Sequence, residues 1–206
     1  DSIRHAITKL SHIHLVTKKR EKKRIIQMGE KKKSIFIIGS PDIDLLKSKK
    51  LPNLKSALKR YSVPFSDYAI AILHPLNAIS IRDQKIKAKN FFESLKKSNY
   101  NFIIIKPNND LGNEFILNEI KSIKKINFKI YPSVRFEYFL TLLKFSNFII
   151  GNSSAGVMEA PYYGVPCINV GDRQKNRTTN SNQKNVSYDK KILFNLINHY
   201  VKNKKR

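Results

Sequence analysis

The sequence has only one cysteine and no tryptophan, and it has no long apolar run. The single thiol, Cys167, excludes an internal disulfide framework and is typical of the reducing cytoplasm, where we expect this protein. No run approaches the roughly 18 apolar residues of a membrane span, so none is expected. A charged start followed by an apolar stretch and a cleavage site is also missing. Because the chain begins at Asp1, we interpret it as a partial chain.

Several signatures of catalysis are absent as well. Cysteine and histidine do not cluster at the spacing of metal ligands, so neither a metal nor another cofactor is expected. The sequence contains no Gly-x-Ser-x-Gly nucleophile elbow and no phosphate-binding loop ending in Gly-Lys-Ser or Gly-Lys-Thr. An obvious pair of acid and base carboxylates is also lacking.

Acidic residues are scarce, with 15 Asp and Glu against 40 Lys and Arg, for a net charge of +25. Such a balance can indicate nucleic-acid binding. However, the cations gather in the short runs 18–24, 31–33, 47–50 and 202–206, without interleaved aromatic residues to stack on bases. Solvated faces are the favoured interpretation, and no nucleic-acid partner is expected. An electrostatic role at a membrane surface or on an acidic partner stays open.

From about residue 61 onward, short β-branched runs alternate with amphipathic stretches, which is the pattern of βα units in a parallel sheet. Strands are predicted at 68–73, 101–105, 128–131, 147–150 and 165–170, and helices at 82–97, 112–123, 135–145, 155–163 and 188–203. The sequence therefore predicts an α/β fold with a Rossmann-like, doubly wound parallel sheet.

The first residues have a different character. Strands at 12–16 and 35–38 with a helix at 18–28 are too few to close a core. We therefore expect residues 1–46 to be the tail of a preceding domain. A linker at 47–60, a doubly wound domain at 61–187 and a C-terminal helix at 188–206 are expected to follow.

The loop that follows strand 147–150 is the first candidate site. Its small residues, including Gly151, Asn152, Ser153 and Ser154, let a ligand approach the backbone. The helix start behind it offers unpaired N–H groups and positive dipole charge, which suit a phosphate. A serine that merely caps the helix, for about 1 kcal/mol, explains the local pattern equally well.

Three further positions could serve the same edge of the sheet. Glu159 is flanked by apolar residues, so it needs hydrogen-bond donors such as ribose hydroxyls; a surface helix former is the alternative. His74, at the end of strand 68–73, could donate to a phosphate oxygen or transfer a proton, or simply end the strand. Arg173 and Arg177 could stabilise a departing diphosphate or lie on a surface loop.

A set of motifs then resembles one family, the hydrolysing UDP-N-acetylglucosamine 2-epimerases of bacterial sialic acid and related nonulosonate pathways. The matching segments are 3–12, 39–44, His74-Pro75, 149–161, Gly164-Val165-Pro166 and 169–177. They lie in the expected order over nearly the whole chain.

The resemblance implies a GT-B-like architecture, in which two Rossmann-type domains bind a UDP-sugar between them. By that resemblance, residues 61–187 are the nucleotide-binding second domain, and residues 1–46 are the tail of a truncated N-terminal Rossmann-like domain. It implies that His74, as a catalytic residue, lines the diphosphate and ribose site together with Ser153, Ser154 and Glu159. Phe139 or its neighbour Tyr138 would lie near the uracil.

The implied reaction is loss of UDP with removal of the C2 proton to give 2-acetamidoglucal, followed by addition of water to give N-acetylmannosamine. The acid and base carboxylates of the family lie in the first domain, so activity of this chain alone is left open. Alternatives are an epimerase acting on UDP-N,N'-diacetylbacillosamine, a GT-B glycosyltransferase, and a non-catalytic basic fragment that binds nucleic acid. Homo-oligomer formation is left open.

Overall fold

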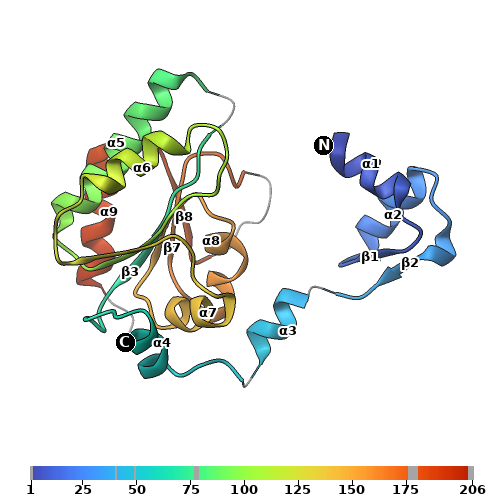
Figure 1. Ribbon diagram of the computed structural model, residues 1–206, viewed down its shortest axis with the longest axis horizontal. Coiled ribbons are helices and arrows are strands. Elements are labelled where there is room, and N and C mark those ends of the chain that lie inside the picture. The colour runs from blue at the N-terminus through green and yellow to red at the C-terminus, as the bar shows by residue number, and fades with distance from the viewer. Residues whose placement is uncertain (1, 40, 49, 77–78, 176–180, 204–206) are drawn as a thin grey trace. The chain divides into compact units, whose positions relative to one another are not determined.

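The computed structural model describes residues 2–39, 41–48, 50–76, 79–175 and 181–203. The chain forms two compact units, Asp1–Lys50 and Leu51–Arg206 (Figure 1). Among the described residues, no helix is long and apolar enough to cross a membrane.

The first unit is small. Its elements are α1 (Ser2–Leu10), β1 (His14–Val16), α2 (Lys19–Gln27), the 3-10 helix η1 (Lys32–Ser34), β2 (Ile35–Ile37) and α3 (Pro41–Lys47). The two strands pair in parallel, and α2 packs against both. Parallel sheets are normally buried on both faces. Here Ile3, Leu10 and Ile13 are more than half exposed, so the unit has little core of its own. Helix α1 lies outside the predicted elements.

The second unit holds the candidate site. Its helices are α4 (Leu54–Arg60), α5 (Ile81–Ser98), α6 (Asn113–Lys121), α7 (Phe136–Lys144), α8 (Ala155–Met158), the 3-10 helix η2 (Ala160–Tyr163) and α9 (Lys190–Lys202). Its strands are β3 (Ala69–Ile72), β4 (Phe102–Ile105), β5 (Phe128–Tyr131), β6 (Ile149–Gly151), β7 (Cys167–Val170) and β8 (Gln183–Val186).

The described residues of this unit form six parallel strands in the order β5-β4-β3-β6-β7-β8. Numbered within the unit this is 3-2-1-4-5-6, the order of dinucleotide-binding sheets. Figure 1 shows α5, α6 and α9 on one face of the sheet and α7 and α8 on the other. The predicted Rossmann-like, doubly wound parallel sheet is confirmed. The strand order reverses between β3 and β6, and ligands of such sheets bind at that point.

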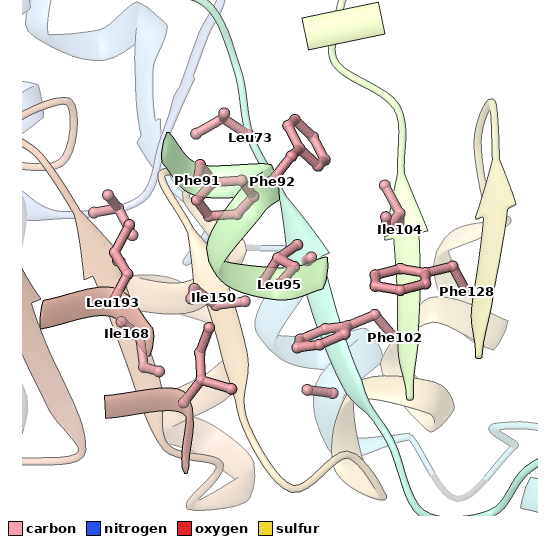
Figure 2. Packing of buried hydrophobic residues seen from close by; sticks show 14 of the residues in the cluster. Leu73, Phe91, Phe92, Leu95, Phe102, Ile104, Phe128, Ile150, Ile168 and Leu193 are labelled. Atoms are coloured by element: carbon pink, nitrogen blue, oxygen red, sulfur yellow. The ribbon is translucent and has the colours of Figure 1, made fainter. Parts of the chain in front are cut away.

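The main core lies between the sheet and the layer formed by α5, α6 and α9. Phe91, Phe92 and Leu95 of α5 are almost fully buried against strand residues such as Phe102 and Ile150 (Figure 2). Full burial of one such side chain contributes about 1.5–3 kcal/mol relative to leaving it exposed. This packing holds the ends of β3 and β6 in place.

The prediction of a linker at 47–60 is wrong over residues 54–60, which form α4. Asn53 caps this helix by accepting from the Ser56 N–H (2.8 Å), and Ala57 is fully buried. The Thr141 hydroxyl on α7 donates to the Pro52 carbonyl (2.7 Å), so α4 is tied to the second unit. The lysine-rich composition of 47–60 does not predict a helix. Helix α4 forms because tertiary packing, rather than its own sequence, stabilises it.

One other predicted boundary changes, and one strand had not been predicted. The helix predicted at 155–163 ends at Met158, because Pro161 has no N–H to continue the helical hydrogen bonds, and η2 follows. Strand β8 was not predicted, since Gln183–Val186 is polar and only partly buried at the sheet edge. An edge strand with this composition lacks the apolar pattern by which the other strands are recognised.

Candidate functional site

The candidate site lies where β3 and β6 end side by side, at the reversal of the strand order. Gly151 pairs with Ile72 and has φ of +137°. A Cβ atom at position 151 would lie 1.8 Å from the Ile72 carbonyl oxygen. Only glycine allows β6 to approach β3 this closely at its last residue, so the loop after β6 begins directly beside the residues that follow β3.

Asn152 fastens this loop to His74. Its side chain is fully buried; Oδ1 accepts from the His74 backbone N–H (2.7 Å), and Nδ2 donates to the His74 carbonyl oxygen (2.9 Å). The Asn152 N–H donates to the Ile72 carbonyl oxygen (3.1 Å). The Asn152 side chain therefore acts like an additional peptide group that continues the pairing of β3 with β6.

Three further side chains surround Asn152. Its Nδ2 also donates to the Tyr188 hydroxyl (3.3 Å), whose pKa is raised to about 12 by burial. Its backbone carbonyl oxygen accepts from Arg173 Nη1 (3.1 Å) and from Gln174 Nε2 (2.8 Å). Because the Asn152 side chain makes its hydrogen bonds to His74 and Tyr188 within the protein, we assign it a positioning role rather than a ligand contact.

The imidazole of His74 is held at one nitrogen. Nδ1 lies 3.2 Å from Asn108 Oδ1 and 3.3 Å from the Asn108 backbone nitrogen, whose N–H it accepts in the neutral ring. Asn108 Nδ2 donates to Asp110 (2.6 Å), which orients the amide. Asn108 thus satisfies Nδ1 in either protonation state, which leaves Nε2 available for a ligand. Asn108 was not among the predicted site residues.

Partial burial and the Arg173 guanidinium lower the pKa of His74, against smaller opposing effects of Asn108 and Asp110. The fold therefore favours the neutral ring. Its contribution to stability is present above the unfolded pKa near 6.5 and is lost as pH falls through the lower folded value. We expect the stability advantage of wild type over His74→Gln to shrink between pH 7.5 and pH 5, as measured by urea unfolding.

The exposed histidine of α9 provides the control. His199→Gln removes an imidazole from the same unit without touching the site. If the difference in stability between wild type and His74→Gln stayed constant over this pH range, the lowered pKa of His74 would be contradicted.

Ser153 and Ser154 follow Asn152 in the loop and are half-buried. Ser153 Oγ accepts from the Ala155 N–H (3.3 Å), whereas Ser154 makes no side-chain cap. Within the described part of the chain, no acceptor binds the backbone N–H groups of these two serines. Helix α8 has only four residues, so its dipole is small. An anion here would depend on individual donors rather than on a long helix.

The remaining predicted residues are placed as follows. Glu159 is half-buried at the turn between α8 and η2. Phe139 is 7% exposed and stacks on Phe136, with ring centroids 6.4 Å apart. It has little surface to offer a base, so we leave it out of the proposed site. Tyr138 lies under Arg60, whose guanidinium is 4.9 Å from the ring centroid. Arg177 lies outside the described residues.

A cleft of about 590 Å³ opens next to the loop after β3. Its walls carry two cationic side chains, Lys87 and Arg173, and two carboxylates, Asp110 and Asp172. Pro75, Leu76 and Tyr188 add apolar surface. Arg173 therefore borders both this cleft and the Asn152 peptide. In the described ranges, no three His, Cys, Asp or Glu side chains gather where they could hold a metal ion.

Comparison with known proteins identifies the family of the chain. A family model described as UDP-N-acetylglucosamine 2-epimerase matches residues 1–206. A UDP-N-acetylglucosamine 2-epimerase of Neisseria meningitidis serogroup B is 47% identical over 197 residues, which cover 96% of this chain and 52% of that protein. The polysialic acid biosynthesis protein P7 of Escherichia coli is 37% identical over 202 residues, which cover 95% of this chain and 51% of that protein. The chain spans about half the length of these curated relatives.

Solved structures show the same fold. The crystal structure of UDP-GlcNAc 2-epimerase from Neisseria meningitidis bound to UDP-GlcNAc matches with a TM-score of 0.62 at 18% identity. The match covers 94% of this chain and 56% of that one. The predicted likeness to one half of a GT-B-like two-domain protein is confirmed at the level of the fold.

Proposed function

The chain belongs to the UDP-N-acetylglucosamine 2-epimerase family, and from this premise we propose that it forms the UDP-binding half of a hydrolysing member. The complete protein would release UDP from UDP-N-acetylglucosamine with loss of the C2 proton. Water would then add to the resulting 2-acetamidoglucal to give N-acetylmannosamine. In this proposal the groups that move the C2 proton belong to the remainder of the protein.

One observation carries the proposal. The strand order 3-2-1-4-5-6 brings His74 and the loop of Ser153 and Ser154 together at the reversal point, although they are far apart in sequence. The donors of this loop and of His74 therefore lie at one edge of the sheet, and the cation Arg173 contacts the Asn152 carbonyl of the same loop. Such a set suits a diphosphate, because charge-assisted hydrogen bonds to phosphate oxygens are about twice as strong as neutral ones.

The residues take distinct roles in this proposal. The N–H groups of Ser153 and Ser154 and the Nε2–H of His74 donate to phosphate oxygens. Arg173 balances the charge that develops on the β-phosphate as UDP departs, in the manner of preorganised electrostatic stabilisation. Glu159 accepts hydrogen bonds from the ribose hydroxyls.

The role of Glu159 gives a direct test. Glu159→Gln keeps the size of the side chain but removes its charge, and hydrogen bonds to a charged acceptor contribute about 1.5–3 kcal/mol each. We expect UDP affinity, measured by calorimetry, to fall about 10- to 100-fold, with the melting temperature within a few degrees of wild type. Glu114→Gln, an exposed change in the first turn of α6, is the matched control. Retained UDP binding with a large loss of stability would make Glu159 structural.

The catalytic part of the proposal needs the complete protein. Incubated with UDP-N-acetylglucosamine, it should release UDP and N-acetylmannosamine, while the 206-residue chain should bind UDP without turnover. Robust UDP release by this chain alone would refute the proposal that the groups that move the C2 proton belong to the remainder of the protein. The same assay with UDP-N,N'-diacetylbacillosamine determines whether that sugar is preferred.

A further inference from the structure

Gln174 is a buried residue to which the site described above assigns no ligand. It is 2% exposed, and its Nε2 donates to the Asn152 carbonyl oxygen at 2.8 Å. Its Oε1 is also buried and accepts from no donor among the described residues. Burying an amide with one unsatisfied acceptor costs free energy. Stability alone is therefore a poor explanation for a glutamine at this position.

The bond from Gln174 acts on a peptide group rather than on a single atom. The carbonyl of Asn152 and the N–H of Ser153 belong to the same rigid peptide, and in a trans peptide they point in opposite directions. No cis peptide occurs in the described residues. Donors on the Asn152 carbonyl oxygen therefore hold the Ser153 N–H pointing away from the loop after β7. In the strand order β3-β6-β7, His74 follows β3, the strand on the opposite side of β6 from β7.

Arg173 donates to the same oxygen, but the two donors differ in burial. The Arg173 side chain is exposed and uses Nη1 for this bond (3.1 Å). It can turn toward an incoming anion, because a guanidinium has five N–H donors. Gln174 has no such freedom, since it is enclosed. Without Gln174, departure of Arg173 would leave the Asn152 carbonyl without a side-chain donor, and the peptide could flip and present oxygen to the anion.

We propose that Gln174 is a positioning residue of the anion site. It locks the Asn152–Ser153 peptide so that the Ser153 N–H, rather than the Asn152 carbonyl oxygen, faces the diphosphate. This inference rests on the proposed UDP site and adds a residue that acts through the peptide without touching the nucleotide. Its hydrogen bond also polarises the peptide and strengthens the N–H as a donor.

The test compares the affinities of Gln174→Met for UDP and for uridine. Methionine preserves the length of the side chain but cannot donate to the Asn152 carbonyl, and it also removes the unsatisfied Oε1. The melting temperature should therefore stay within a few degrees of wild type. We expect UDP affinity to fall about tenfold, while uridine, which has no phosphate, binds within about twofold of its wild-type affinity.

Gln183→Met is the matched control. Gln183 is a half-buried glutamine of β8 whose Oε1 likewise has no donor among the described residues, but its Nε2 donates to Asn185 (2.6 Å), away from the site. It should leave both affinities unchanged. Equal losses for UDP and uridine in Gln174→Met, or no loss for UDP, would overturn the positioning role.

A second measurement needs no variant and covers the case in which Gln174→Met fails to fold. In the wild-type chain, UDP but not uridine should shift the Ser153 amide proton resonance downfield, as expected for a new hydrogen bond to an anion. An unshifted Ser153 amide with UDP bound would refute the inference and the role proposed for the Ser153 N–H, while the binding of UDP by this chain would still stand. Failure of the wild-type chain to bind UDP would overturn both.

Discussion

Gly151→Ala is expected to prevent the second unit from folding. The added Cβ would lie 1.8 Å from the Ile72 carbonyl oxygen and 2.6 Å from its carbonyl carbon. These are backbone atoms of a paired strand, so no side-chain rotation relieves the collision. A φ of +137° adds backbone strain for any residue with a Cβ. Relief would require β3 and β6 to separate where their pairing supports the core.

The expected loss exceeds about 4 kcal/mol, in the range of severe core disruptions, and should appear as loss of cooperative thermal unfolding by circular dichroism. Gly164→Ala is the matched control. Gly164 also has positive φ, at +66°, but a Cβ there would meet no atom within 4 Å. Its cost should be only about 1–2 kcal/mol, from the left-handed conformation. Comparable stability of the two variants would show that the close approach of β6 to β3 is not rigid.

Asn152→Asp is expected to cost about 3–5 kcal/mol at pH 7, because it places an unpaired charge at a fully buried position. One aspartate oxygen can still accept from the His74 N–H. The other would face the His74 carbonyl oxygen, where Nδ2 now donates at 2.9 Å. The hydrogen bond to the His74 carbonyl oxygen is therefore lost, and the carboxylate oxygen repels that carbonyl oxygen. The change should also reduce UDP affinity, because the His74 backbone keeps only one of its two hydrogen bonds to residue 152.

The pH dependence identifies the cause. Burial and the facing carbonyl would raise the pKa of the new carboxyl above its unfolded value near 3.9. The penalty is then smallest when the carboxyl is protonated and can donate. It should grow by about 1.4 kcal/mol per pH unit as pH rises from the unfolded toward the folded pKa. Urea unfolding at several pH values measures this slope.

An exposed substitution with the same change of charge provides the reference. Asn118 lies on the exposed face of α6, and Asn118→Asp should leave stability almost unchanged with pH. If Asn152→Asp showed the same flat profile, the buried amide could not be the anchor of His74.

Local patterns in the sequence were enough to predict the parallel sheet. Strands such as Phe128–Tyr131 and Phe102–Ile105 are short, apolar and β-branched or aromatic, and the structure places them within one residue of the prediction. The small-residue loop after β6 and His74 after β3 were also recognisable, because the ends of buried strands are marked by glycine, proline and polar residues. These features depend on neighbours in sequence, so they can be read without the fold.

Other features depend on partners far away in the chain. Helix α4 is recognised by its packing on α7 rather than by its lysine-rich sequence. Phe139 has the spacing of an apolar helix face, and only the packed structure shows that its ring is enclosed. Strand β8 is polar, and its place at the edge of the sheet becomes visible only when β7 is beside it.

The sequence by itself therefore determined the class of sheet, the family resemblance and the loop from Gly151 to Gly156. The tertiary structure decided what the residues of that loop do. The sequence suggested that Asn152 binds a ligand. In the structure its side-chain amide is hydrogen-bonded to the backbone N–H and carbonyl oxygen of His74, 78 residues away. Gln174 lay in the matching segment 169–177 with no role assigned to it, but it is buried against the Asn152 carbonyl. The physical reason is that sequence patterns report local propensity. The hydrogen-bond partner of a buried polar group depends instead on which strands lie next to each other in the folded sheet.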